Sequence, residues 1–203
     1  PRKPSWLFHP HFLNKERNES EVHAMTRHAI LRLVTAALCL ALGILLPIVF
    51  HAIGGAGAVF LPMHIPVLLC GLLCGPRLGA LCGLATPLLS SAFTGMPPLY
   101  PIAVAMMLEL AAYGLAAGLL KKRFQVHPSL VGAMLAGRIV LGVANTLLLG
   151  FGGKPYSLEA FLAASFVTAL PGIAIQIALI PALVLALQRA NVAERRYPKE
   201  ARG

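Results

Sequence analysis

The sequence contains no aspartate and only seven acidic residues, and charged residues of both signs make up 12% of its 203 positions. Because 58% of the residues are hydrophobic, so few charges would not cover the core of a soluble domain. The sequence also lacks the Gly-x-Ser-x-Gly elbow of hydrolases, the His-Glu-x-x-His zinc motif and the Gly-x4-Gly-Lys-Ser/Thr phosphate loop. These absences argue against a soluble protein and against an enzyme, and we expect no catalytic residue, metal, cofactor or nucleic-acid partner.

Long apolar runs are the most abundant feature of the sequence. A membrane-spanning helix needs about 20 mostly apolar residues, and the runs lack the alternating period of barrel strands. The second and third runs are short and are separated only by Gly75, Pro76 and Arg77, so they form either two spans or one broken hairpin. We predict an all-α membrane protein whose domain, residues 29–188, is a bundle of six transmembrane helices at 29–50, 58–74, 78–93, 100–120, 130–150 and 160–187.

Basic residues are distributed unevenly around these runs. All of the 17 Lys and Arg except Arg138 and Lys154 lie in segments that share one side of a six-pass bundle. Since cytoplasmic segments are enriched in Lys and Arg, both termini are predicted to be cytoplasmic. Residues 1–28 and 189–203 are expected to be basic tails, the first of them disordered, with Met25 placed like an ordinary start before the first span.

Two ionisable residues lie deep inside predicted spans, where they are costly and therefore candidates for function. Glu109 is near the middle of the fourth span and Arg138 is in the fifth, and an ion pair would reduce the cost of burying either. Asn145 shares a helical face with Arg138, Tyr113 is one turn from Glu109, and Gln176 adds an amide in the sixth span. The pair is either a structural lock between helices or part of a ligand site, and the convergence of polar residues favours the site.

Two loops on the predicted outer side are rich in Gly and Pro. Residues 51–66 and 94–101 contain no Lys, Arg, Asp or Glu, so we expect them to act as lids over a ligand rather than as solvated connectors. His64 and Thr94 are the polar side chains in these loops that we predict to contact a ligand. A structural role for His64 is the alternative interpretation.

Small residues recur at four-residue spacing, which lets membrane helices approach closely. The four cysteines all lie in apolar runs and are predicted to be small packing residues rather than disulfide partners. Most of these sets are expected to serve packing within the bundle, with one available for a partner subunit. They are Ala37/Ala41, Gly71/Gly75, Gly79/Gly83, Gly114/Gly118 and Ala178/Ala182/Ala186.

Residues 29–188 resemble the substrate-binding S component of energy-coupling factor (ECF) transporters, which import vitamins in prokaryotes. The resemblance lies in the six short helices and in a set of motifs, which are 61–69 (LPMHIPVLL), 86–91 (TPLLSS), 94–98 (TGMPP), 109–114 (ELAAYG), 137–139 (GRI) and 168–172 (TALPG).

The resemblance implies a multi-pass subunit of a prokaryotic cell membrane that captures a vitamin from outside and has no catalysis of its own. It would dock on a transmembrane scaffold protein and two cytoplasmic ATPases, as part of an ABC-type importer. Family members use an AxxxA patch on the first helix for docking, and Ala37 and Ala41 match that spacing. Pantothenate, a pyridoxine-like compound, cobalamin and folate remain open as substrates. A stand-alone secondary carrier or channel is the alternative function.

Overall fold

The computed structural model describes residues 10–52, 60–151, 161 and 167–196. All regular secondary structure in these ranges is helical, which confirms the all-α prediction for the part of the chain described. The longer elements are α1 (Pro10–Ala52), α3 (His64–Cys74), α4 (Pro76–Thr94), the π-helical turn η2 (Leu99–Ala103), α5 (Val104–Leu120), α6 (Val126–Phe151) and α8 (Leu170–Arg196).

Among the described residues, four helical segments are long and apolar enough to cross a membrane. They are Ala29–Phe50, Leu99–Leu120, Val126–Leu148 and Leu170–Leu187. The apolar helix α3 has only 11 residues, about 16 Å of helix, which is roughly half of a bilayer core. The count of six spans and the cytoplasmic position of both termini therefore remain predictions.

Helices α3 and α4 form the hairpin that the sequence left open as an alternative. Gly75 alone separates them, with φ of 95°, a value that favours glycine, and Pro76 begins α4. The amide of Gly75 donates to the carbonyl of Gly71 at 3.1 Å. A Cβ atom at Gly79 would lie 2.6 Å from Cα of Gly71, so the two helices turn back on each other in close contact.

Glycines also bring the backbones of α4 and α5 together. A Cβ atom at Gly79 would lie 2.6 Å from the carbonyl oxygen of Gly114, and one at Gly114 would collide with the backbone of Gly79. Gly83 faces the backbone of Leu110 and Gly118 faces that of Pro76 in the same way. The small-residue pairs predicted on these two helices are therefore packing residues inside the bundle.

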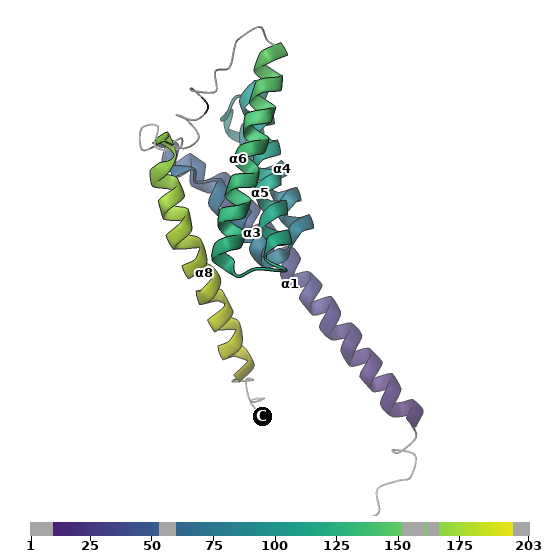
Figure 1. The fold of residues 1–203 in the computed structure, drawn as a ribbon. Helices are drawn as coiled ribbons and strands as arrows, with labels where there is room; N and C mark the ends of the chain where they lie inside the picture. Colours follow the sequence, from purple (N-terminus) through teal and green to yellow (C-terminus); the bar gives the residue numbers. More distant parts are fainter. Residues whose placement is uncertain (1–9, 53–59, 152–160, 162–166, 197–203) are drawn as a thin grey trace, which may run out of the picture.

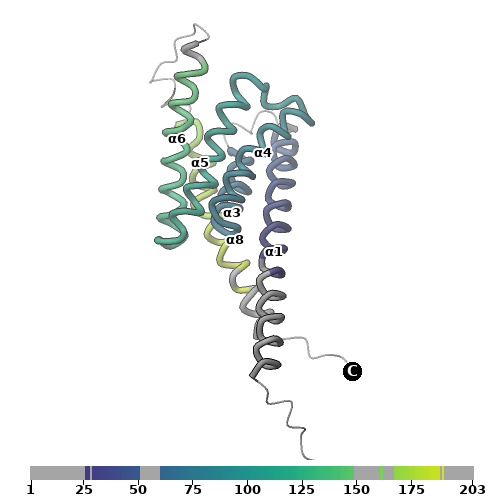
Figure 2. Tube along the Cα trace, turned by 90° about the vertical axis from the view of Figure 1, so that its right-hand side faces the viewer, coloured from purple at the N-terminus to yellow at the C-terminus, as the bar shows by residue number. Residues whose placement is uncertain are grey.

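The centre of the bundle is α3, which contacts α1, α4, α5, α6 and α8. All but two of its eleven residues are buried. Figure 1 shows α3 between these helices, with α8 along one flank and the long helix α1 running away from the bundle. Figure 2 shows α1 and α6 on opposite sides of the central helices. A helix that is apolar on every face is expected at such a position, because it has no solvent or lipid side.

The four cysteines meet in this core. Cys39 on α1, Cys70 and Cys74 on α3, and Cys82 on α4 are all buried free thiols. The thiol of Cys70 has those of the other three as side-chain neighbours. Their role as small packing residues, expected from their apolar surroundings, agrees with the structure.

Helix α1 begins well before the first predicted span. Residues 10–28 are helical, while 1–9 lie outside the described residues, and the division of the chain into two tails and one domain stays a prediction. The segment 11–28 contains neither Gly nor Pro, so nothing in its sequence interrupts a helix that continues from the apolar run. Helix α8 likewise continues to Arg196, into the predicted C-terminal tail, and 197–203 are not described.

Candidate functional site

A tight turn places His64 at the start of α3. The amide of His64 donates to the carbonyl of Leu61 at 3.1 Å, and Leu61 has φ of 51°. This left-handed backbone costs a residue other than glycine about 1–2 kcal/mol, so the surrounding packing must hold it in place. Pro62, Met63 and His64 are all buried. The strained turn therefore fixes a histidine inside the bundle, and such strain is typical of functional positions.

An ion pair between α5 and α6 lies beside this histidine. Nη1 of Arg138 donates to Oε1 of Glu109 at 3.0 Å, and the side chains are 8% and 2% exposed. Nε2 of His64 lies 3.5 Å from the same carboxylate oxygen. The ion pair predicted between Glu109 and Arg138 is therefore formed, and His64 from α3 contacts it.

Aromatic packing orients the histidine. The rings of His64 and Tyr113 are 5.1 Å apart in an edge-to-face arrangement at 74°, which is a favourable geometry for aromatic pairs. Gly137, next to Arg138 on α6, leaves room for the Tyr113 ring, since a Cβ atom there would lie 2.9 Å from the ring carbons. We refer to His64, Glu109, Tyr113 and Arg138 as the polar cluster.

Several buried nitrogen atoms in and near the polar cluster lack hydrogen-bond partners. Both ring nitrogens of His64, Nε of Arg138 and Nε2 of Gln176 are buried without a hydrogen bond to any described residue. Each such group costs about 1–3 kcal/mol relative to a satisfied one. The charges of Glu109 and Arg138 balance each other. The hydrogen-bonding groups left without a partner are therefore N–H donors and the ring nitrogens of His64. This arrangement suits a ligand that presents acceptor atoms.

The other predicted site residues lie in different surroundings. Gln176 is fully buried in α8, a helix that packs on α3 and α6. Asn145 is half-buried on α6, seven residues or about 10 Å beyond Arg138. Thr94 is exposed, and its hydroxyl donates to the carbonyl of Ser90 at 2.7 Å, closing the end of α4. The structure therefore gives Thr94 a local role and does not bring it into the polar cluster.

The described part of the second loop is held against the bundle. The hydroxyl of Ser90 donates to the carbonyl of Met96 at 2.8 Å, and the hydroxyl of Tyr100 donates to the carbonyl of Leu148 on α6 at 3.1 Å. Tyr100 and Gly137 were not singled out as site residues from the sequence. The only signal for Tyr100 was a polar aromatic side chain between two prolines. Residues 53–59 of the first loop lie outside the described residues.

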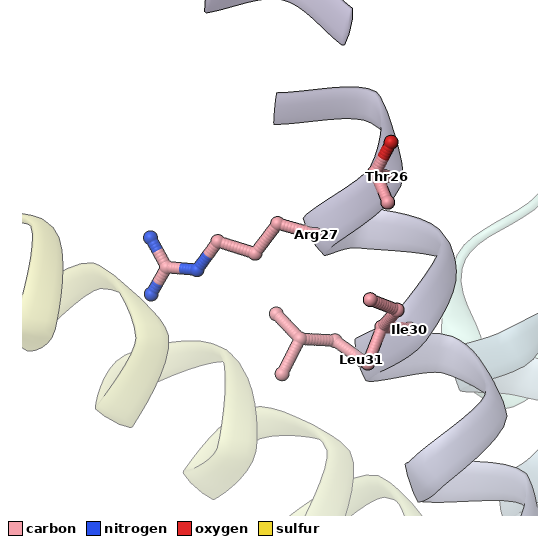
Figure 3. Close-up of a pocket in the computed structure, with 4 residues that line it drawn as sticks. All are labelled: Thr26, Arg27, Ile30 and Leu31. Atoms are coloured by element: carbon pink, nitrogen blue, oxygen red, sulfur yellow. The ribbon is translucent and has the colours of Figure 1, made fainter. Parts of the chain in front are cut away.

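A surface groove of about 400 Å³ lies elsewhere, on α1, and is lined by Thr26, Arg27, Ile30 and Leu31. Figure 3 shows Arg27 extending from α1 towards α8 across this groove. Its lining residues are exposed, and none of the buried polar side chains in the part of the chain that the structure describes lines it. Within the described ranges, no three His, Cys, Asp or Glu side chains are arranged to hold a metal ion.

The fold and the polar cluster define an integral membrane protein of apolar helices with a buried ionic centre. A family model described as the substrate-specific component of ECF transporters matches residues 31–184, well over half of the chain. The chain belongs to this family, whose members are substrate-binding membrane subunits rather than enzymes and assemble with scaffold and ATPase subunits. No curated protein and no solved structure matches the chain.

Proposed function

We propose that this S component captures a vitamin or related micronutrient on the outer side of a prokaryotic cell membrane. Delivery inward would follow docking on a transmembrane scaffold and two cytoplasmic ATPases. The observation that carries the substrate-binding half of the proposal is the polar cluster. An ion pair, a free histidine and unpartnered donors at the centre of an apolar bundle are expensive, and a ligand that uses them accounts for their presence.

The proposed substrate site is centred on Arg138, Glu109 and His64, which three different helices contribute. Tyr113 supports the histidine ring, and Gln176 supplies an amide that no described residue uses. Polar groups that converge in an apolar surrounding are the usual composition of small-molecule sites. Asn145 and Thr94 are placed at the periphery of this site.

An acid and a base in one site suit a substrate that has both polar and ionised groups. Pantothenate or a pyridoxine-like compound meets this description. Cobalamin and folate also carry such groups but are far larger.

The proposed docking surface lies on α1. Ala37 and Ala41 are both exposed, so their small side chains do not serve packing inside the bundle. Leu38 and Leu42 beside them are exposed as well, which gives an apolar strip with a shallow centre. Such a strip fits a partner helix, because small residues allow two backbones to approach.

The experiment for this function is the purification of the full chain, expressed in its native membrane, followed by mass spectrometry of released small molecules. We expect a retained vitamin-like compound, which the Arg138→Ala variant should lose while still inserting. Copurification of one scaffold protein and two ATPases is the second expected result. Uptake by proteoliposomes that contain this chain alone, without ATP, would instead identify a secondary carrier or channel.

A further inference from the structure

The groove on α1 lies where the first membrane-spanning segment begins. Thr26 and Arg27 come just before the apolar run that starts at Ala29, and Ile30 and Leu31 lie one turn further along the helix. One helical turn is about 5 Å, so the groove reaches from the polar boundary of a bilayer into its hydrocarbon. The groove therefore combines a cationic mouth with an apolar floor, over about 400 Å³.

The guanidinium of Arg27 forms no ion pair with any residue that the structure describes. The ion pairs in the described ranges are those of Glu109 with Arg138 and with His64, and Arg27 is exposed. Figure 3 shows its side chain extended across the groove, with the guanidinium turned away from α1. An arginine near the end of a span extends its charge to the membrane interface. A guanidinium at this depth is a two-point donor for a phosphate group.

The apolar floor of the groove is left uncovered by the bundle. Helix α1 packs mainly on α3 and α4, and Ile30 and Leu31 are 54% and 51% exposed. Val34 and Leu38 are exposed as well. Spacings of three and four residues keep side chains on one helical face, so these positions form a strip that leads from Arg27 into the membrane. An acyl chain parallel to α1 would cover this strip, whereas a soluble anion would leave it bare.

The end of the bundle that bears the groove is basic. Arg32 on α1 binds the carbonyl of Cys74, so the start of α1 lies at the tip of the α3–α4 hairpin. Figure 1 shows the connection between α5 and α6 at this end, with α8 running towards the same side. The acidic residues between positions 26 and 189 are Glu109, in the polar cluster, and Glu159, outside the described residues. The exposed basic residues at this end include Arg77, Lys122, Arg123 and Arg189.

We propose that the groove on α1 binds an anionic phospholipid, whose phosphate pairs with Arg27 and one of whose acyl chains lies on Ile30 and Leu31. Basic pockets beside membrane helices are typical sites for anionic headgroups, and each methylene that the protein covers adds to the affinity. A zwitterionic lipid carries its own cation, which competes with Arg27 for the phosphate. The site is separate from the polar cluster and adds a lipid to the ligands proposed for this chain.

The test is native mass spectrometry of the full chain, delipidated in detergent and titrated with two lipids of identical acyl chains. The probes are dioleoylphosphatidylglycerol, which is anionic, and dioleoylphosphatidylcholine, which is zwitterionic. We expect the anionic lipid to bind at least about fivefold more tightly, since one basic group near a membrane surface contributes roughly this factor. Glycerol 3-phosphate at the same concentration should not displace it, because that anion has no acyl chain.

Two variants with matched controls identify the groups responsible. Arg27→Gln should reduce the preference for the anionic lipid to less than about twofold, whereas Arg123→Gln, an exposed site after α5, should keep it. Leu31→Asn places an amide where the acyl chain lies and should weaken the binding of both lipids. Leu119→Asn, at an exposed leucine near the end of α5, should not. Size-exclusion profiles establish that each variant is folded.

Equal affinity for the two lipids would overturn the proposal. So would an unchanged preference in Arg27→Gln, or an equal loss in Arg27→Gln and Arg123→Gln, which would indicate a diffuse basic surface rather than a groove. Displacement by glycerol 3-phosphate would identify a site for a soluble anion instead. Loss of copurification with a scaffold and ATPases in Arg27→Gln, at an unchanged lipid preference, would assign the groove to a partner protein and not to a lipid.

Discussion

Replacement of the two charges in the polar cluster separates a structural pair from a substrate site. Arg138→Met leaves the Glu109 carboxylate, 2% exposed, without its cation. Breaking a buried pair on one side typically costs about 3–5 kcal/mol. The burial of both side chains places this pair in that range rather than in the range of about 0–1 kcal/mol for surface pairs. Glu109→Leu should cost a similar amount, because it strands the guanidinium.

The double variant with both replacements should recover most of this loss. Apolar residues of similar volume in place of a buried ion pair are often neutral or stabilising, so the double variant should lie within about 1 kcal/mol of the parent. The coupling free energy from the four proteins would then be about 5 kcal/mol or more, larger than the usual coupling between contacting residues. Reversible unfolding in mixed detergent micelles with increasing SDS measures these free energies.

The second measurement on the same four proteins is ligand retention. A structural pair predicts that the double variant regains both stability and ligand, whereas a substrate site predicts a stable protein that retains none. Arg123→Met is a suitable control, since Arg123 is exposed after α5. If Arg138→Met lowered the unfolding free energy by less than about 1 kcal/mol, the pair would not be a buried one and the reasoning would fail.

Three further predictions concern packing, docking and the edge of the site. Gly114→Ala should destabilise the bundle by about 1–3 kcal/mol in SDS titrations, because the new Cβ atom meets the backbone of α4. The control is Gly132→Ala, whose Cβ atom meets only the flexible end of a leucine side chain. Equal effects of the two substitutions would contradict the backbone contact. Ala37→Trp should prevent copurification with the scaffold and ATPases while ligand binding persists, and Ala92→Trp, at an exposed site on α4, should not; loss of ligand as well would indicate a folding role. Asn145→Ala should weaken substrate binding roughly tenfold, equivalent to one lost hydrogen bond, and an unchanged Kd by calorimetry would remove Asn145 from the site.

The helices and the ion pair were predictable from the sequence for simple physical reasons. Lipid permits only hydrogen-bonded helices or closed barrels, so apolar runs of sufficient length determine where helices form. Glu109 and Arg138 are ionisable residues deep within spans, and each is the least costly partner for the other. Glycines at four-residue spacing likewise predicted close backbone packing, and the contact between Gly79 and Gly114 shows it.

Other features depend on tertiary contacts that composition does not reveal. An apolar run looks the same whether it faces lipid or protein, so the sequence did not show that α3 is a short helix buried on nearly every side. The hydroxyl of Thr94 donates to the carbonyl of Ser90 at the end of α4, a local contact that the sequence does not reveal, and its contact with a ligand stays a prediction. The start of α1 at Pro10 is also not evident from the sequence, because the polar, basic composition of this segment differs from that of the apolar run that follows it.

The short central helix connects the two proposed activities of the molecule. His64, in the polar cluster, begins α3, and the carbonyl of Cys74 at its other end accepts from the guanidinium of Arg32 on α1. Arg32 lies on the same helix as the proposed docking residues Ala37 and Ala41. Because α3 has 11 residues and is packed against glycine backbones, we expect it to move as one unit rather than to bend. If a substrate that binds beside His64 shifts α3, the contact between Cys74 and Arg32 would carry that shift to the helix that bears the proposed docking residues.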